Sequence, residues 1–294
     1  MTTLFFTITF LFTCHLSGIL NPINQLQAIP AGYRLDAPAE RIFLPDVLRE
    51  VSGVAVIDRN TLAFVQDEKG IVFLYDFQKR TIKREILFTD EGDFEDLAMV
   101  NNTIYVLRSD GTLYEITNFN SPDYQVRSYK TGIPCKDNEG LCYDPKNNRL
   151  LIGCKGKIEK EELENKRVVY AFDLKLKKLI KNPVFVFDPR AVRKFTKDKK
   201  VNLQGKDEDH ELSLRTSAIG INPLNGRLYL LSADDYCLFV FSEKGKTEFI
   251  ISLDKELYNK AEGLAFLPDG KLLVTNEGEK GKPTLVVINR IRTE

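Results

Sequence analysis

The chain has 294 residues, which is long enough for one large all-β domain. Lysine and arginine together number 42, as do aspartate and glutamate, so no overall charge favours nucleic acid or an anionic membrane surface. The two histidines, His15 and His210, are too few for a histidine-rich transition-metal site, and no glycine-rich nucleotide-binding motif occurs. A Ser-His-Asp or Cys-His mechanism would have to rely on His210, because His15 falls in the N-terminal segment.

The N-terminal segment contains a short apolar run at residues 4–13, LFFTITFLFT. The run is too short to span a bilayer as a helix and is typical of the central part of a secretory signal. We therefore expect residues 1–28 to be a signal peptide and tether, and the protein to be exported to the periplasm or surface of a bacterium. A buried N-terminal strand is the alternative. A lipid anchor at Cys14 would be the protein's one contact with a membrane.

A strand is expected at Tyr33–Leu44, and five similar segments follow it. Aligned on their first residue, the segments open at Ser52, Glu95, Glu139, Ser217 and Glu262, at intervals of 43, 44, 78 and 45 residues. Each segment reads as a β-hairpin; in the last, AEGLAFLPDGKLLVTNEG, two apolar runs flank a Pro-Asp-Gly turn. A strand-based period of about 40–50 residues predicts a β-propeller.

The doubled interval has an explanation that needs no extra blade. Residues 157–167 form a charged insert, and residues 189–214 are first basic and then acidic, which predicts a short helix and an exposed loop. We expect five blades in a single domain over residues 29–294; six would require a degenerate blade within residues 176–214. The last repeat has only three strands, ending at Val286–Asn289, so the strand at Tyr33–Leu44 is expected to complete that blade and close the ring.

Four cysteines follow Cys14 and show no CxxC spacing of a zinc site: Cys135, Cys142, Cys154 and Cys237. In the hairpin of the third repeat, the predicted register places Cys142 opposite Leu151 and Cys154 opposite Glu139. Cys142 and Cys154 are therefore not expected to bond each other. The interpretation we prefer is that the cysteines are buried free thiols.

The repeats together resemble the SdiA-regulated family of bacterial envelope propellers. The matching segments run from Leu48 to Gly278 and are LREVSGVAV, DFEDLAMV, NEGLCYD, RLYLLSADD and AEGLAFLPDGKLLVTNEG. The chain departs from the family pattern at Asp96, where a glycine is usual, and at Lys155, where an acid is usual. The resemblance implies a propeller of five or six blades with no settled biochemical activity. A more distant similarity links it to phytase-like and lactonase-like propellers, some of which use calcium.

The opening residues of the repeats are expected to converge, because the first strand of each blade lines the channel of a propeller. Glu95, Glu139 and Glu262 would then meet at one channel mouth, where their repulsion requires pairing, protonation or a bound cation. Hard carboxylate oxygens suit Ca²⁺ or Mg²⁺, so these three are the predicted metal ligands, with Ca²⁺ as the expected ion. The predicted ligand-binding residues of the same rim are Ser52, Asp67, Arg108, Ser217, Ser232, Asn276 and Glu277.

Ion pairs offer another way to neutralise this mouth. Arg108 and Lys155 lie at the ends of second strands and could pair with the glutamates, leaving a purely structural interaction scaffold. The function that we favour is a monomeric, non-catalytic envelope protein that binds a small molecule or a protein at the mouth, through a divalent cation if one is present. The alternative enzyme would be a metal-dependent hydrolase of a phosphoester or a lactone, in which metal-bound water attacks.

Overall fold

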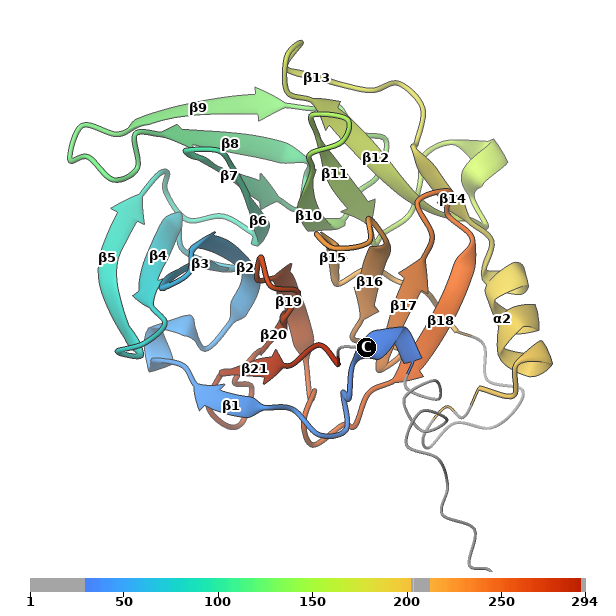
Figure 1. Cartoon of the computed structure of the whole chain (residues 1–294). Coiled ribbons are helices and arrows are strands. Elements are labelled where there is room, and N and C mark those ends of the chain that lie inside the picture. The colour runs from blue at the N-terminus through green and yellow to red at the C-terminus, as the bar shows by residue number, and fades with distance from the viewer. Residues whose placement is uncertain (1–29, 202, 204–211, 292–294) are drawn as a thin grey trace, which may run out of the picture.

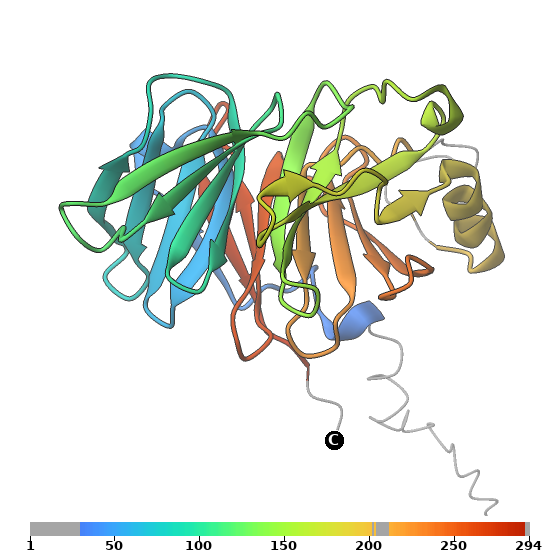
Figure 2. The same ribbon diagram turned by 90° about the horizontal axis from the view of Figure 1, so that it is seen from above.

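The structure is a computed structural model that describes residues 30–201, 203 and 212–291. Within these residues, five antiparallel sheets stand around a central axis as the blades of a propeller (Figure 1). Figure 2 shows the same ring from the side, with the blades packed face to face. The predicted all-β propeller of five blades is confirmed.

Each blade begins with its innermost strand at the axis and ends with its outermost strand. The first consists of β2 (Val51–Asp58), β3 (Thr61–Gln66), β4 (Ile71–Asp76) and β5 (Thr81–Leu87). The second consists of β6 (Phe94–Val100), β7 (Thr103–Arg108), β8 (Thr112–Thr117) and β9 (Gln125–Lys130). The third consists of β10 (Asn138–Asp144), β11 (Arg149–Cys154) and β12 (Arg167–Asp173), with β13 (Lys178–Leu179) and β14 (Phe185–Phe187) both paired to β12.

The fourth blade consists of β15 (Ala218–Ile221), β16 (Leu228–Ser232), β17 (Cys237–Phe241) and β18 (Thr247–Ser252). The fifth consists of β19 (Ala261–Phe266), β20 (Leu272–Asn276), β21 (Thr284–Ile288) and β1 (Glu40–Phe43). Short 3-10 helices occupy Pro30–Gly32, Asp46–Leu48 and Glu161–Leu163, the last within the charged insert predicted at residues 157–167.

The ring is closed by the N-terminal strand, as predicted. β1 runs antiparallel to β21, with Arg41 opposite Val286 and Ile42 opposite Leu285. The strand is shorter than expected, because Tyr33 forms only an isolated bridge with Arg290. The Tyr33 hydroxyl donates to the Gly270 carbonyl at 2.7 Å and so anchors the start of the described chain on the fifth blade. Closure leaves β21 paired on both sides.

The apolar core is divided into layers between neighbouring blades. Val65 and Leu74 of the first blade, for example, pack in one cluster with Phe94 and Val106 of the second. The middle strands are apolar on both faces because each blade is covered on both sides, whereas the outer strand β9 is mostly exposed. This arrangement places the five innermost strands side by side around the channel (Figure 1).

The long connection between the third and fourth blades contains the helix α2 (Pro189–Asp198), as expected, and no further blade is present in the described part of it. Asp188 caps the helix by accepting from the Arg190 amide at 2.9 Å, and Pro189 occupies the first turn. His210, the predicted signal segment and Cys14 lie outside the described residues. Among the described helices, none has the length and apolar character needed to cross a membrane.

Candidate functional site

The predicted column of opening residues coincides with a repeated backbone irregularity. A β-bulge interrupts the pairing of the first strand with the second in four blades, between Val51 and Gly53, Phe94 and Asp96, Asn138 and Gly140, and Ala261 and Gly263. The residues left without a partner in the register are Ser52, Glu95, Glu139 and Glu262. A β-bulge changes the direction in which a side chain points, and bulges are common next to functional sites. In the fourth blade, Ser217 directly precedes β15 and takes the corresponding place.

The residue after each bulge explains the departure at Asp96. At the equivalent Gly263, a Cβ would lie 2.3 Å from Oγ1 of Thr275 on β20 and 3.2 Å from the Val54 amide of the next blade, so the space there is too small for a side chain. Asp96 instead reaches across to the third blade, accepting from the Leu141 amide at 2.7 Å and from the Leu97 amide at 2.8 Å. Burial raises the pKa of Asp96 well above its usual range. Asp96 therefore links two blades rather than facing a ligand.

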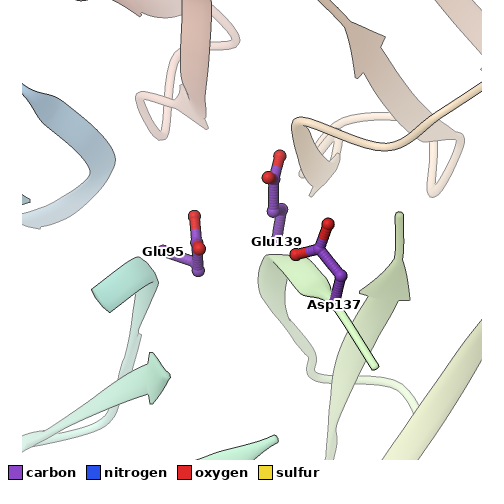
Figure 3. A group of neighbouring side chains, drawn as sticks. All are labelled: Glu95, Asp137 and Glu139. Carbon is purple, nitrogen blue, oxygen red and sulfur yellow. The ribbon is translucent and has the colours of Figure 1, made fainter. Parts of the chain in front are cut away.

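Three carboxylates meet at the second and third blades. One oxygen each from Glu95, Asp137 and Glu139 lies within 4.8 Å of the others (Figure 3). Glu139 is buried and the other two are half-buried. Asp137 was not among the predicted ligands. Its signal in the sequence is that it stands two residues before Glu139, as Asp93 stands two residues before Glu95.

Lys155 supplies the cation of this mouth. Its Nζ forms an ion pair with Oε1 of Glu139, and 20% of the lysine side chain is exposed. The other oxygen of Glu139, Oε2, is buried and has no hydrogen-bond partner among the described residues. The Glu139 carboxylate is therefore only half satisfied by the protein, and one buried oxygen remains available to a ligand.

Burial and mutual repulsion raise the pKa values of these carboxyl groups. Burial, followed by repulsion from Glu139, raises the pKa of Glu95 to about 10. Burial and repulsion from Glu262 raise the pKa of Glu139 to about 8, against the opposing charge of Lys155. Raised pKa values in a cluster of carboxyl groups mark a place where a bound cation would be stabilising.

Glu262, the third predicted metal ligand, lies apart from this group. It does not belong to the three carboxylates that fall within 4.8 Å in the described chain. Burial raises its pKa to about 7, while Lys155 and a hydrogen bond from Ser217 lower it. The structure therefore couples Glu262 to the site through Lys155 and replaces it in the carboxylate group by Asp137.

A second acidic pair lies at the fifth and first blades. Glu277 forms an ion pair with Lys260 at 2.8 Å. The Asp67 carboxyl has a buried Oδ1 with no hydrogen-bond partner among the described residues. Burial, followed by repulsion from Glu50 and Glu277, raises the pKa of Asp67 to about 6. These two predicted residues thus lie near each other at the same rim, where Lys260 neutralises Glu277 and Asp67 has no ion-pair partner among the described residues.

The remaining predicted residues are used within the fold. Arg108 pairs with Asp110 at 2.7 Å and donates to the Tyr114 hydroxyl at 3.0 Å, so it does not neutralise the glutamates. The other hydroxyl and amide groups form hydrogen bonds with nearby protein atoms. Three of them donate: Ser52 Oγ to the Glu50 carbonyl at 3.1 Å, Ser232 Oγ to Asp235 at 3.0 Å, and Asn276 Nδ2 to the Leu257 carbonyl at 3.1 Å. Ser217 Oγ accepts from the Ala233 amide at 3.1 Å.

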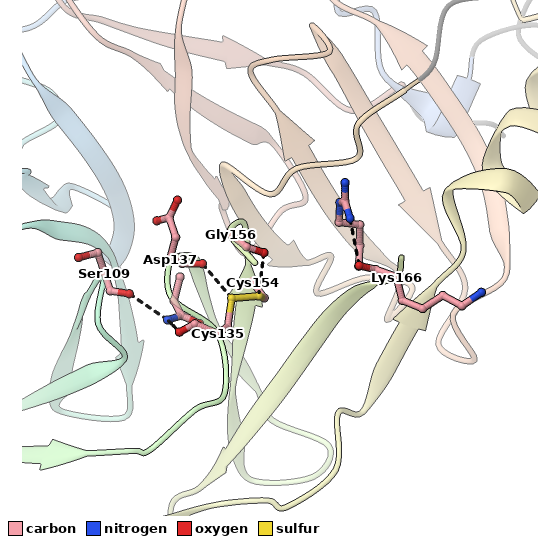
Figure 4. Close-up of a disulfide and its surroundings, with 8 residues drawn as sticks. Ser109, Cys135, Asp137, Cys154, Gly156 and Lys166 are labelled. Atoms are coloured by element: carbon pink, nitrogen blue, oxygen red, sulfur yellow. Dashed lines mark hydrogen bonds between the residues drawn. A yellow bond between two sulfur atoms is a disulfide. The ribbon is translucent and has the colours of Figure 1, made fainter. Parts of the chain in front are cut away.

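A disulfide joins Cys135 to Cys154 beside the carboxylates (Figure 4). The expectation of free thiols was wrong for these two cysteines and is confirmed for Cys142 and Cys237, which are buried and form no disulfide within the described residues. The hairpin register alone could not reveal the bond, because Cys135 lies outside the hairpin, in the segment that leads into β10. The predicted pairing of Cys142 with Leu151 is confirmed, whereas the bulge at Glu139 places Cys154 opposite Asn138.

The opposite end of the channel is apolar. Four residues after each opening residue stands a half-buried apolar side chain, and we call these five residues the apolar ring: Val56, Met99, Tyr143, Ile221 and Phe266. They line a cavity of about 170 Å³. The charged chemistry of the channel is therefore confined to the end that carries the bulges, which we call the carboxylate end.

Comparison with solved structures supports the fold. A crystal structure of Myxococcus xanthus glutaminyl cyclase is similar, with a TM-score of 0.59 and 13% identity, covering 88% of this chain and 97% of that chain. A structure of a nidogen/laminin complex is similar with a TM-score of 0.50 and 11% identity, covering 80% of this chain and 74% of that chain. At such identities the likeness shows the fold alone.

Sequence comparison identifies the family. None of the curated proteins matches this chain. The sequence profile of the SdiA-regulated family matches residues 28–280, which include all five inner strands and every residue of the carboxylate end discussed above. The chain therefore belongs to the SdiA-regulated family.

Proposed function

We propose that this protein is a non-catalytic binding protein of the cell envelope that takes up a divalent cation, Ca²⁺, at Glu95, Asp137 and Glu139. The observation that carries the proposal is the group of three carboxylates within 4.8 Å, which includes a buried oxygen of Glu139 without a partner among the described residues. Calcium takes six to eight oxygen ligands in flexible geometry. Three carboxylates leave coordination positions open, and a bound small molecule or protein would occupy them.

The location in the envelope is part of the same proposal. The apolar run at residues 4–13 has the character of an export signal. The disulfide between Cys135 and Cys154 supports export, because such bonds persist mainly in oxidising compartments. A protein tethered outside the cytoplasm also meets calcium at higher concentrations, which suits a site with few charged ligands.

Calcium binding tests the proposal directly. Titration calorimetry should show one Ca²⁺ bound, and Ca²⁺ at a hundred times its Kd should stabilise the fold by about 2.7 kcal/mol, raising Tm by roughly 5–10 °C. Asp137→Asn and Glu139→Gln should abolish most of this response. Asp123→Asn is the matched control, because Asp123 is exposed between β8 and β9 of the second blade and lies outside the group. Absence of Ca²⁺ and Mg²⁺ binding at millimolar concentrations would leave the scaffold interpretation.

Hydrolysis of a phosphoester or a lactone is the second candidate function. The observation that favours it is Glu262, whose pKa of about 7 matches a general acid or base at neutral pH. Glu262 and the carboxylate group share Lys155 as a neighbour, so a base and a metal-activated water would stand at one mouth. This candidate requires metal-dependent turnover that Glu262→Gln removes while calcium binding survives.

A further inference from the structure

Lys155 stands at the electrostatic centre of the carboxylate end. Its ammonium group is paired with Glu139 of the third blade. The same charge lowers the pKa of Glu262 on the fifth blade and of Glu95 on the second. One lysine therefore acts as the common counter-ion of three glutamates that come from three different inner strands.

The backbone holds this lysine firmly in place. The amides of Lys155 and Gly156 both donate to the Asp137 carbonyl, at 2.9 and 3.0 Å. A Cβ at Gly156 would lie 2.5 Å from Cβ of Asp137, so the two segments are in close contact. Cys154, the residue before the lysine, is bonded to Cys135, two residues before Asp137 (Figure 4). The backbone segments that carry Lys155 and Asp137 are thus held together.

A cation bound by the three carboxylates must share Glu139 with this lysine. Oε1 of Glu139 is taken by Lys155, and only Oε2 is free of a partner in the described chain. Two cations that share one carboxylate lie close together, and like charges repel strongly where water is excluded. When a metal ion binds, the ammonium group must therefore move away from Glu139; if it stays, it lowers the affinity of the site for the metal.

We propose that Lys155 is a specificity-determining residue: a tethered cation that competes with soluble cations for the carboxylate end and admits divalent ions in preference to monovalent ones. This inference rests on the proposed function. A monovalent ion that replaces the ammonium group gains no charge and competes with a group held at high effective concentration. A divalent ion brings twice the charge to the same carboxylates and displaces the lysine.

Calorimetric titration of Ca²⁺ into four proteins tests this role. Lys155→Met should bind Ca²⁺ about tenfold more tightly than the wild type, whereas Lys155→Arg, which keeps the charge, should stay within about threefold. Lys157→Met is the matched control: it removes the same charge two residues away, where the side chain is 73% exposed and pairs only loosely with Glu164, at 3.8 Å. Its affinity should match that of the wild type.

Selectivity provides a readout that a merely structural role would not change. Sodium chloride should raise the Tm of Lys155→Met above its value in N-methylglucamine chloride of equal ionic strength, and should not do so for the wild type. If Lys155→Met folds poorly, Lys155→Met/Glu262→Gln restores the charge balance and should show the same gains. If Lys155→Met and Lys155→Met/Glu262→Gln both bind Ca²⁺ as tightly as the wild type or more weakly, the inference is overturned and the proposed function stands. Failure of the wild type and of both variants to bind Ca²⁺ overturns both.

Discussion

The two ends of the central channel are built from the same inner strands, yet they differ in what their side chains require. At the carboxylate end, Glu95 and Glu139 have raised pKa values, and one buried oxygen of Glu139 lacks a partner in the described chain. The apolar ring begins four residues further along each strand, about 13 Å away, and contains no titratable carboxyl group. The carboxylate end therefore offers charged groups to a ligand, whereas the five residues of the apolar ring offer none.

Bulges account for the difference between the ends. At the carboxylate end, an unpaired residue enters the first strand of four blades, whereas the residues of the apolar ring are themselves paired, as for Met99 opposite Ile104; the first blade alone has a second irregularity, directly after Val56. A bulge turns one side chain out of the packed sheet, so a carboxylate placed there avoids the apolar layers between the blades. The regular positions remain in those layers and are apolar for that reason.

Cysteine variants should give the largest difference between the ends. Replacing both Cys135 and Cys154 by serine removes a cross-link over 19 residues and should lower the free energy of unfolding by about 3 kcal/mol. Cys142→Ala, in the wall of the cavity at the apolar end, should cost only about 1 kcal/mol. Urea unfolding under oxidising conditions measures both. Equal stabilities of the double serine variant and the wild type would show that the cross-link does not constrain the carboxylate end.

Asp96 directly follows the opening residue Glu95, and its variants should have an effect of intermediate size on stability. Asp96→Ala leaves the buried amides of Leu97 and Leu141 without acceptors and should cost about 2–3 kcal/mol of unfolding free energy. Asp96→Asn keeps one acceptor oxygen and should cost about 1 kcal/mol. Denaturant unfolding of the two variants at pH 7 tests this order. Equal losses would indicate that Asp96 acts through packing rather than through its hydrogen bonds.

The pH dependence of stability that arises from Asp67, at the carboxylate end, should give the smallest effect. The pKa of Asp67 is about 6 in the folded protein and 3.8 in the unfolded chain, so the folded state binds the proton more tightly. Its contribution to stability is therefore full below about pH 4 and is lost as the pH rises to 6. Asp67→Asn should remove this loss and raise Tm by about 2 °C at pH 7, with no gain at pH 4.

Met99→Leu, in the apolar ring, is the control for this measurement. It changes no titratable group, so its Tm should follow the wild-type pH profile in parallel. A pH profile of Asp67→Asn that also runs parallel to that of the wild type would mean that Asp67 is solvated like an ordinary surface carboxylate.

Much of the fold follows from the repeats in the sequence. The opening residues recur at nearly constant spacing, and the segment at Ala261–Asn276 forms the hairpin that its Pro-Asp-Gly turn predicts. The missing fourth strand of the last repeat led to the closure that β1 provides with β21. These predictions succeed because turn residues and apolar runs determine hairpins from the local sequence alone. In addition, few other segments of the chain can pair with the open sheet edge of the last blade.

The candidate site was predicted less completely. Glu95 and Glu139 meet as their shared repeat position requires, but Asp137 joins them in place of Glu262. Arg108 was a plausible counter-ion at the end of a second strand, yet it bonds to Asp110 two residues away. The position of a residue in the repeat determines at which end of the blade its backbone lies. The direction of a long charged side chain depends on the nearest group of opposite charge, and the spacing of the repeats does not reveal that group.

The propeller, its closure and the end of the channel at which carboxylates gather could all be predicted from the sequence, because they depend on periodicity and on local turn chemistry. The tertiary structure was needed to show that Asp137 lies with Glu95 and Glu139, that Lys155 pairs with Glu139, and that Cys135 is bonded to Cys154. Those outcomes depend on ångström-scale approaches between segments from different blades and loops. Such approaches are set by the packing of whole sheets, and no short stretch of sequence encodes them.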